Sequence, residues 1–500
     1  MLRAGGWAFP AIPLLLTSVL LAQSPIEPTD ELQELRARLD AQDAEISFLR
    51  DQLTNPSPVF ASAPLFDDCL PGDDCIDRPE RTQLPLTAEV PIEDSCDASG
   101  NAKSSLSVPF YADYDRGFLI RPFDPDEHPF LLRINGWIQF RHHAFDRDVD
   151  SWTDNAGTTR PIRSRNAFDI ERARLVFSGY AVDERLTYFL QLDGDTDDGH
   201  IVDFFDYWWA WKFDDALNVQ LGKRKVPAVR QWLLGARDTR FVDRPISCDF
   251  FRPDRTVGIF AEGDIGTMHY EAMVGNGYQS ANRPEFETDS SFTYAATSYW
   301  DPLGPYGPGL TDPQMLDDLR IRFGHSFVFS PQRNIEDEIV LNEADFLRLT
   351  DGTRLTAPGA LAPGVTVRGV DLYLYGLDFA AKWAGWSLNS EVFFRWLQDF
   401  EATGPVPYDG LFARGFYVEG GRFLVKDVLD INARYGQIDG LFGNSSEIAG
   451  GFNWYPLKKK QLKISFDVTS IDSSPHNGTA SDVLVGDDGT LFRTQLQAEF

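Results

Sequence analysis

From about residue 117 to its end, the chain alternates apolar and polar residues in stretches separated by breaks rich in Gly, Asp and Pro. In FLLRINGWIQFRHHAF, alternate positions are mostly apolar from Phe130 to Phe140 and mostly polar from Arg133 to Arg141. Successive side chains of a strand point to opposite faces, so each stretch predicts a β-strand with one apolar face. In DFFDYWWAWKF the apolar face would carry Phe205, Tyr207, Trp209, Trp211 and Phe213.

The connections between these stretches differ in length: Ala384-Gly385 is short, whereas 288–318 and 472–489 are long and polar. A transmembrane barrel has tight turns at one end and long loops at the other. A soluble β-sandwich also alternates, but the aromatic row would then have to pack on protein. The pattern favours an all-β fold, a transmembrane antiparallel β-barrel over residues 116–500, with a secreted soluble β-rich protein as the alternative.

The chain ends with TLFRTQLQAEF, which repeats the alternation. Phe492, Leu496 and Phe500 would share one face of a strand, and Arg493 and Gln495 the other. This predicts a final strand that stops on an aromatic residue.

Three segments precede the barrel. Arg3 and the apolar run that follows it predict a signal peptide over 1–22, which is too short and too Pro-interrupted for a membrane anchor. Residues 30–54 predict a short coiled coil with opposite charges at its g and e positions, which favours a parallel homo-oligomer; a single amphipathic helix is the alternative. Its seam is Leu32, Leu35, Leu39, Gln42, Ile46, Leu49 and Leu53. Residues 55–115, rich in Pro, Asp and Ser, predict a flexible linker.

The formal net charge of −30 argues against nucleic-acid binding, because the phosphate backbone would repel such a surface. An exported chain meets an oxidising compartment, so a Cys69–Cys75 disulfide is expected in the linker. Cys248 is either unpaired or bridged to Cys96. The cysteine spacing does not favour a metal site.

An ordered series of short motifs resembles the phosphate-selective porin O and P family of outer-membrane porins, from about Gly117 to Phe500. The motifs are FDIERARLVFSGYAVDERLTYFLQLD, LNVQLGKRKVP, FVDRPIS, RTVGIFAEG, VGNG, GFYVEGGRFLV and GFNWYPLKKKQLKISF. The resemblance implies a sixteen-stranded barrel, a homotrimer, and a third extracellular loop folded into the lumen as the constriction. It also implies that Phe500 is the aromatic residue read during outer-membrane assembly.

Basic residues concentrate where the resemblance places the constriction. Over 223–255, nine basic residues face four acidic ones, a local excess of five positive charges in an acidic chain. Such an excess would raise the local anion concentration; the alternative is that the arginines only fold the loop against acidic wall residues. The candidates for an anion path are Arg133, Arg141, Arg172, Arg174, Lys223, Arg224, Lys225, Arg230, Arg237, Arg240 and Arg244. Acidic loops such as DGDTDDGH would repel anions at the mouth.

Other chemistry finds little support. DGDTDDG lacks the glycine and the glutamate of a calcium loop, and His142 and His143 are adjacent in a strand, so they point to opposite faces. No P-loop, H-E-x-x-H or G-x-S-x-G motif is present. The sequence therefore predicts no cofactor, no metal and no enzyme. It predicts an outer-membrane porin for small hydrophilic solutes with a possible preference for phosphate-like anions, its coiled coil in the periplasm; the alternative is a structural barrel whose coil tethers the membrane to the cell wall.

Overall fold

The structure is a computed structural model that describes residues 110–196, 202–280, 288–333, 346–478 and 481–500. The predicted signal peptide (1–22), coiled coil (30–54), Cys69–Cys75 disulfide and most of the predicted linker (55–115) lie outside these residues, as does Cys96. The last residues of the linker range form strand β1. Cys248 is buried in the short helix α3 (Ile246–Phe251).

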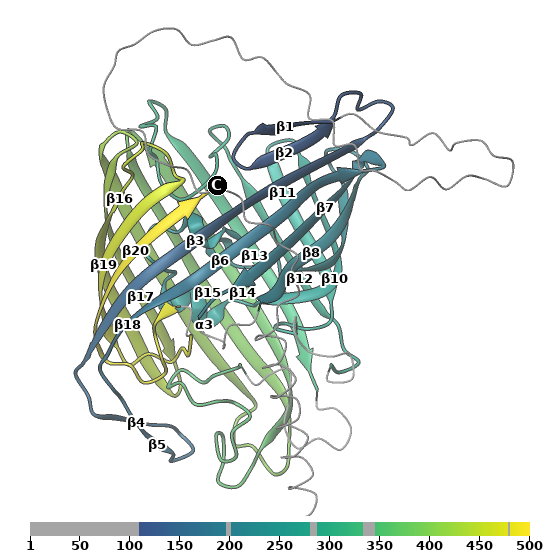
Figure 1. Ribbon diagram of the computed structural model, residues 1–500. Helices are drawn as coiled ribbons and strands as arrows, with labels where there is room; N and C mark the ends of the chain where they lie inside the picture. Colours follow the sequence, from purple (N-terminus) through teal and green to yellow (C-terminus); the bar gives the residue numbers. More distant parts are fainter. Residues whose placement is uncertain (1–109, 197–201, 281–287, 334–345, 479–480) are drawn as a thin grey trace, which may run out of the picture. The chain divides into compact units, whose positions relative to one another are not determined.

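The regular secondary structure of the described chain is almost entirely β-strand (Figure 1). The first ten are β1 (Phe110–Tyr114), β2 (Phe118–Pro122), β3 (Phe130–Arg147), β4 (Ser151–Thr153), β5 (Thr159–Pro161), β6 (Arg165–Ala181), β7 (Asp183–Gly194), β8 (Val202–Lys212), β9 (Asn218–Lys225) and β10 (Arg255–Ile265). The others are β11 (Met268–Gly275), β12 (Thr293–Trp300), β13 (Arg320–Gln332), β14 (Val367–Trp383), β15 (Trp386–Ala402), β16 (Gly410–Val425), β17 (Leu429–Gly440), β18 (Gly443–Trp454), β19 (Leu462–Asp472) and β20 (Gly489–Glu499).

Sixteen of these strands form a closed antiparallel barrel, as predicted. The main sheet has 18 strands, and β3 and β6 to β20 remain when the hairpin of β1 and β2 is set apart. The barrel closes because β20 pairs with β3 from Gly489↔Arg147 to Glu499↔Trp137. The backbone N–H of Phe500 then donates to the carbonyl of Gly136 at 3.0 Å, so the terminal residue takes part in the closure.

The outer face of the barrel is apolar, and many side chains that point into the lumen are polar or charged, beside a buried apolar cluster that includes Phe251 and Phe393. In β20, Phe492 and Leu496 are 42% and 41% exposed, whereas Arg493 and Gln495 are 2% and 1% exposed. A belt of exposed apolar side chains is unfavourable in water and favourable in contact with the hydrocarbon chains of lipids. No helix in the described part of the chain is long and apolar enough to cross a membrane.

The predicted alternation of β8 is wrong at its start. Phe205, expected on the apolar outer face, points into the lumen, and Phe204 is 53% exposed in its place. A β-bulge causes the change, because Gln191 pairs with Asp206 and Leu192 with Phe204, which leaves Phe205 as the extra residue. A bulge inserts one residue into the alternation and so exchanges the two faces.

The two ends of the barrel differ. Tight turns such as 384–385 join strands at the end that holds Phe500, which we call the short-turn end. Long connections such as 346–366 and 473–488 lie at the opposite, long-loop end. The connection 301–319 between β12 and β13 is the long exception at the short-turn end.

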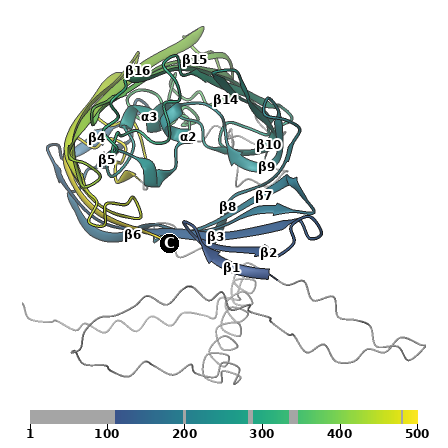
Figure 2. The same ribbon diagram turned by 90° about the horizontal axis from the view of Figure 1, so that it is seen from above.

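Several connections reach into the lumen, among them loop 473–488, whose His476 lines the cavity there, and two more hold its filled side. The lumenal segment, residues 226–254, carries α2 (Arg230–Leu233), the 3₁₀ turn η1 (Ala236–Asp238) and α3. Figure 2 shows α2 and α3 inside the ring of strands, on the side of β14 and β15. The second inward segment, residues 301–319, buries Tyr306 and Leu310. The two segments meet where Arg240 Nη2 donates to the carbonyl of Leu310 at 2.8 Å.

One glycine of β16 makes room for the lumenal segment. A Cβ on Gly415 would lie 2.5 Å from Cε2 of Phe251, which is too short for real atoms. A Cβ on Gly421 would first meet the neighbouring strand β17, at Oδ1 of Asn432 and at the carbonyl oxygen of Ile431, which would lie 2.5 Å away.

Candidate functional site: the lumenal cavity

A cavity of about 300 Å³ lies in the lumen, between the lumenal segment and the wall formed by β6 to β10. Its charged lining holds six basic and six acidic side chains. The basic ones are Arg172, Arg174, Lys225, Arg244, Arg252 and Arg255, and the acidic ones are Glu171, Asp193, Asp195, Asp243, Asp249 and Asp254. His476 also lines it, and burial lowers the pKa of His476 to about 4, so this ring is neutral at neutral pH. The positive excess counted along 223–255 is therefore balanced in space by carboxylates of the wall and the segment.

Most of the arginines in the lining bind a carboxylate directly. The pairs are Arg174–Asp193 (2.7 Å), Arg255–Asp206 (2.9 Å), Arg252–Asp249 (2.8 Å) and Arg172–Asp243 (3.1 Å). A guanidinium offers five N–H donors, and Arg252 uses Nε on Asp249 and Nη1 on the carbonyl of Pro253. These two contacts of Arg252 use two of its five N–H donors.

Trp232 of the lumenal segment is the aromatic centre of the basic lining. Four cations lie over its ring: Arg252 at 3.9 Å, Lys225 at 4.7 Å, Arg244 at 5.0 Å and Arg255 at 5.2 Å from the ring centroid. The electron-rich face of an indole attracts cations, which offsets part of the repulsion among these four charges. Basic side chains of the wall and of the lumenal segment therefore lie close together around the Trp232 ring.

Charged side chains of the wall also bind the backbone of the lumenal segment. At the start of α2, the N–H groups of Arg230 and Gln231 donate to Glu391 at 2.7 and 2.9 Å, and at the start of α3 the N–H of Ile246 donates to Glu447 at 2.9 Å. At the end of α2, Lys225 Nζ donates to the carbonyls of Trp232 and Leu234 at 2.7 and 2.9 Å. Helix ends leave N–H and C=O groups without partners inside the helix, and these wall residues provide the missing hydrogen-bond partners. Lys225 therefore holds the segment as well as lining the cavity.

Arg141 ties together three parts of the chain behind the cavity. Its side chain is fully buried and lies 3.0 Å from Glu171 of β6, 3.0 Å from Asp243 of the lumenal segment and 2.9 Å from Asp482 of loop 473–488. Burial disfavours the ionised form of Asp243, but the guanidiniums of Arg172 and Arg141 outweigh it and hold the pKa of Asp243 below its ordinary range. The buried network therefore keeps its carboxylate charged.

Arg240 fixes the filled side of the lumen. Besides Leu310, it donates to Ser387 at 2.7 Å and to Asn432 at 2.9 Å, and its Nε lies 3.7 Å from Glu419. From the wall, Lys382 donates to the carbonyl of Pro308 in the second inward segment at 3.0 Å. These contacts hold both inward segments against β14 to β17.

The predicted candidates for an anion path fall into two groups. Arg172, Arg174, Lys225 and Arg244 line the cavity, and Arg141 lies directly behind it. The other six lie outside the lining, with these contacts: Arg133 with Asp115 (3.3 Å), Lys223 with the carbonyl of Phe204 (2.7 Å), Arg224 with Glu271 (2.7 Å), Arg230 over Tyr306 (5.2 Å), Arg237 with Glu499 (3.5 Å) and Arg240 with Leu310.

Sequence reasoning did not single out Trp232 or His476. Trp232 stands in a stretch with no strand pattern, and His476 stands in a loop that looks like a solvated one. Arg252 and Arg255 were counted with the basic segment but were not named as path residues; their pairing with Asp249 and Asp206 depends on how the segment folds.

One family profile matches part of the chain. The profile of the family "Phosphate-selective porin O and P" matches residues 138–322, a range that includes the lumenal segment and most of the cavity lining. No curated protein matches the chain.

Similar solved structures include the anion-selective porin from Comamonas acidovorans, with a TM-score of 0.47 and 11% identity over 74% of this chain and 100% of that chain. OmpT of Vibrio cholerae in its trimer form has a TM-score of 0.44 and 12% identity over 74% of this chain and 99% of that chain. By sequence, residues 138–322 are thus similar to the phosphate-selective porin O and P family, the family that the ordered motifs of the chain resemble.

Proposed function

We propose that the protein is an outer-membrane porin that lets small hydrophilic solutes diffuse through the lumenal cavity. The observation that carries this proposal is a closed barrel with an apolar outer face and a charged cavity inside. The family match supports a channel in preference to an enzyme. Because bacterial barrels have short periplasmic turns, the short-turn end would face the periplasm, and so would the coiled coil of residues 30–54.

The proposal includes a preference for anions. The family name supports it, and so do the basic side chains that line the cavity. The balanced charge of the lining opposes a strong preference based on net charge alone. At an effective dielectric of about 20, a unit charge about 6 Å away changes the energy of a passing ion by about 3 kcal/mol before screening. Single charges of the lining therefore suffice to change selectivity.

The Arg252–Asp249 pair gives a matched test of this preference. Asp249→Asn leaves the Arg252 charge uncompensated, and the reversal potential in a KCl gradient should move toward anions. Arg252→Gln leaves Asp249 uncompensated and should move it toward cations. Asp249→Asn nearly keeps the side-chain volume, and Arg252→Gln replaces the cation with a shorter neutral polar side chain, so opposite shifts report charge. Two shifts in the same direction, or none, would mean that ions do not pass this pair.

A homotrimer is part of the proposal, supported by the family resemblance and by the charge pattern of the predicted coil. Conductance steps in groups of three test it.

Phe500 is proposed as the assembly signal, since it closes the barrel on Gly136. Phe500→Ser should lower the amount of folded barrel in the outer membrane, and an unchanged amount would reject that role.

One observation favours a second candidate function. Two inward segments fill the lumen beside β14 to β17, which limits the space for solutes. A barrel with little conductance could serve as a structural link between the membrane and the cell wall through its coil. Repeated insertions into a bilayer without current would support this candidate.

A further inference from the structure

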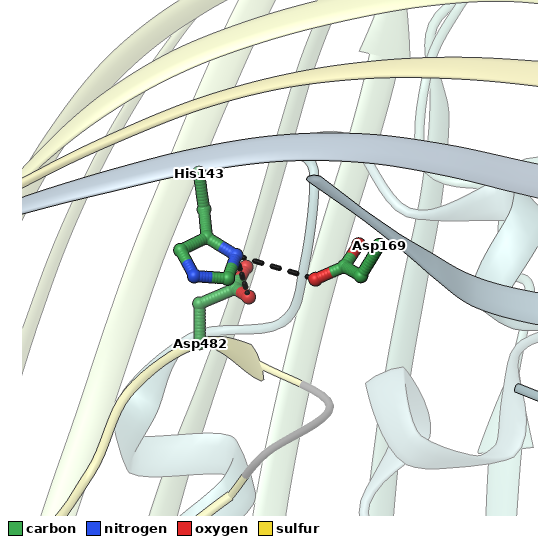
Figure 3. A group of neighbouring side chains, drawn as sticks. All are labelled: His143, Asp169 and Asp482. Atoms are coloured by element: carbon green, nitrogen blue, oxygen red, sulfur yellow. Dashed lines mark ion pairs between the residues drawn. The ribbon is translucent and has the colours of Figure 1, made fainter. Parts of the chain in front are cut away.

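Three side chains from separate parts of the chain meet beside the cavity (Figure 3). His143 comes from β3, Asp169 from β6 and Asp482 from loop 473–488. Nδ1 of His143 lies 2.8 Å from Oδ1 of Asp482 and 3.2 Å from Oδ2 of Asp169. All three donor atoms lie within 4.8 Å of one another.

The geometry of the group is that of ligands around a common centre. Both oxygens lie within ion-pair distance of Nδ1 of His143, and neither makes a hydrogen bond of good geometry with it. Oδ1 of Asp169 is also buried without a hydrogen bond. Ligand atoms about 2.0–2.2 Å from a tetrahedral Zn²⁺ lie about 3.3 Å from each other. The distance from Nδ1 to Asp169 is close to this value, and the distance to Asp482 is shorter.

We propose that His143, Asp169 and Asp482 bind a divalent transition-metal cation. One imidazole nitrogen and two carboxylate oxygens form a ligand set that suits Zn²⁺ and its neighbours in the first transition row better than Ca²⁺ or Mg²⁺, which prefer oxygen alone. Three protein ligands leave a fourth position open to water or to an anion from the cavity.

A second layer of contacts orients the ligands. Nη1 of Arg141 donates to Oδ2 of Asp482 at 2.9 Å, which leaves Oδ1 directed toward His143. Such outer contacts fix the orientation of metal ligands in known sites. Metal binding would therefore fasten loop 473–488 to the wall of β3 and β6.

The group itself offers two carboxylates to a cation, those of Asp169 and Asp482. The neighbouring carboxylates of Glu171 and Asp243 are each bound by the guanidiniums of Arg141 and Arg172. A proton on Nδ1 of His143 is the competing occupant, because both carboxylates lie within ion-pair distance of this nitrogen.

Zinc titration of the purified full-length protein, after treatment with EDTA, tests the proposal. Wild type should bind one Zn²⁺ per chain by calorimetry, and both His143→Gln and Asp169→Asn should weaken that binding at least about tenfold, as loss of a ligand does. His142→Gln is the matched control, because His142 is the neighbouring residue in β3, pairs with Asn166 at 2.8 Å and points away from the site. It should bind zinc like wild type.

Thermal unfolding gives a second readout that does not depend on conduction. Zinc should raise the Tm of wild type and of His142→Gln, and should leave the Tm of Asp169→Asn unchanged, because a ligand that binds the folded state stabilises it. Absence of stoichiometric zinc in wild type would show that a proton occupies the site and would overturn the proposal. Equal losses in the His142 and His143 variants would do the same. A non-conducting protein that still binds zinc would reject the porin function alone.

Discussion

Gly415→Leu should push the lumenal segment off β16 and raise the unit conductance of the barrel. At this point the lumenal segment packs on the wall through the ring of Phe251, which is fully buried. Its ring centroid lies 5.4 Å from that of Phe393, and the two rings are stacked. A Cβ on Gly415 would lie 2.5 Å from this ring and 2.9 Å from the carbonyl of Gln437. The strand backbone is held by its neighbours on both sides, so the segment has to move instead. Overpacking of this kind costs about 1–3 kcal/mol.

Single-channel recording measures this effect. Gly420→Leu is the matched control, because a Cβ on Gly420, also in β16, would meet no atom closer than 3.4 Å. Its conductance should stay at the wild-type value. If Gly415→Leu also keeps the wild-type value while its barrel folds, the lumenal segment does not limit the path.

Arg240→Ala should cause a large loss of stability of the barrel. The Arg240 side chain is about 1% exposed and joins the lumenal segment to Leu310, Ser387 and Asn432. Its removal leaves the carboxylate of Glu419 buried without its nearby cation. Breaking a buried charge pair from one side costs about 3–5 kcal/mol. Urea unfolding of the barrel in lipid vesicles measures this cost.

A second substitution separates charge from packing. Glu419→Gln removes the buried charge, so the double variant Arg240→Ala with Glu419→Gln should recover part of the lost stability. Arg185→Ala serves as a surface control, because the Arg185–Asp183 pair is exposed and should contribute little. A loss for Arg240→Ala no larger than that for Arg185→Ala would contradict the role given to Arg240.

The barrel strands can be predicted from the sequence because successive side chains of a strand point to opposite faces, whatever the strand pairs with. The alternation of β20 places Phe492 outside and Arg493 inside without reference to any distant residue. The same rule fails at Phe205, where the bulge depends on how β8 pairs with β7. The phase of a strand can therefore be predicted from its residues, whereas a bulge depends on its partner.

The lumenal site could be predicted only in part. The sequence shows that 223–255 is basic, and Arg172 and Arg174 share a face as expected. It does not show that Glu391, Glu447 and Lys225 serve the helix ends of that segment, because these contacts join residues far apart in the chain. Likewise, the sequence shows only that His142 and His143 point to opposite faces of a strand and so cannot bind one metal together. The structure supplies Asp169 and Asp482 instead.

The central claim is that ions cross the barrel through the charged cavity. The most direct test is the current of the purified protein in a planar bilayer under a KCl gradient. The proposal predicts discrete steps, grouped in threes, with a reversal potential on the anion side. A bilayer that stays silent through repeated insertions would contradict the claim and favour the structural role, and a reversal potential on the cation side would reject the anion preference.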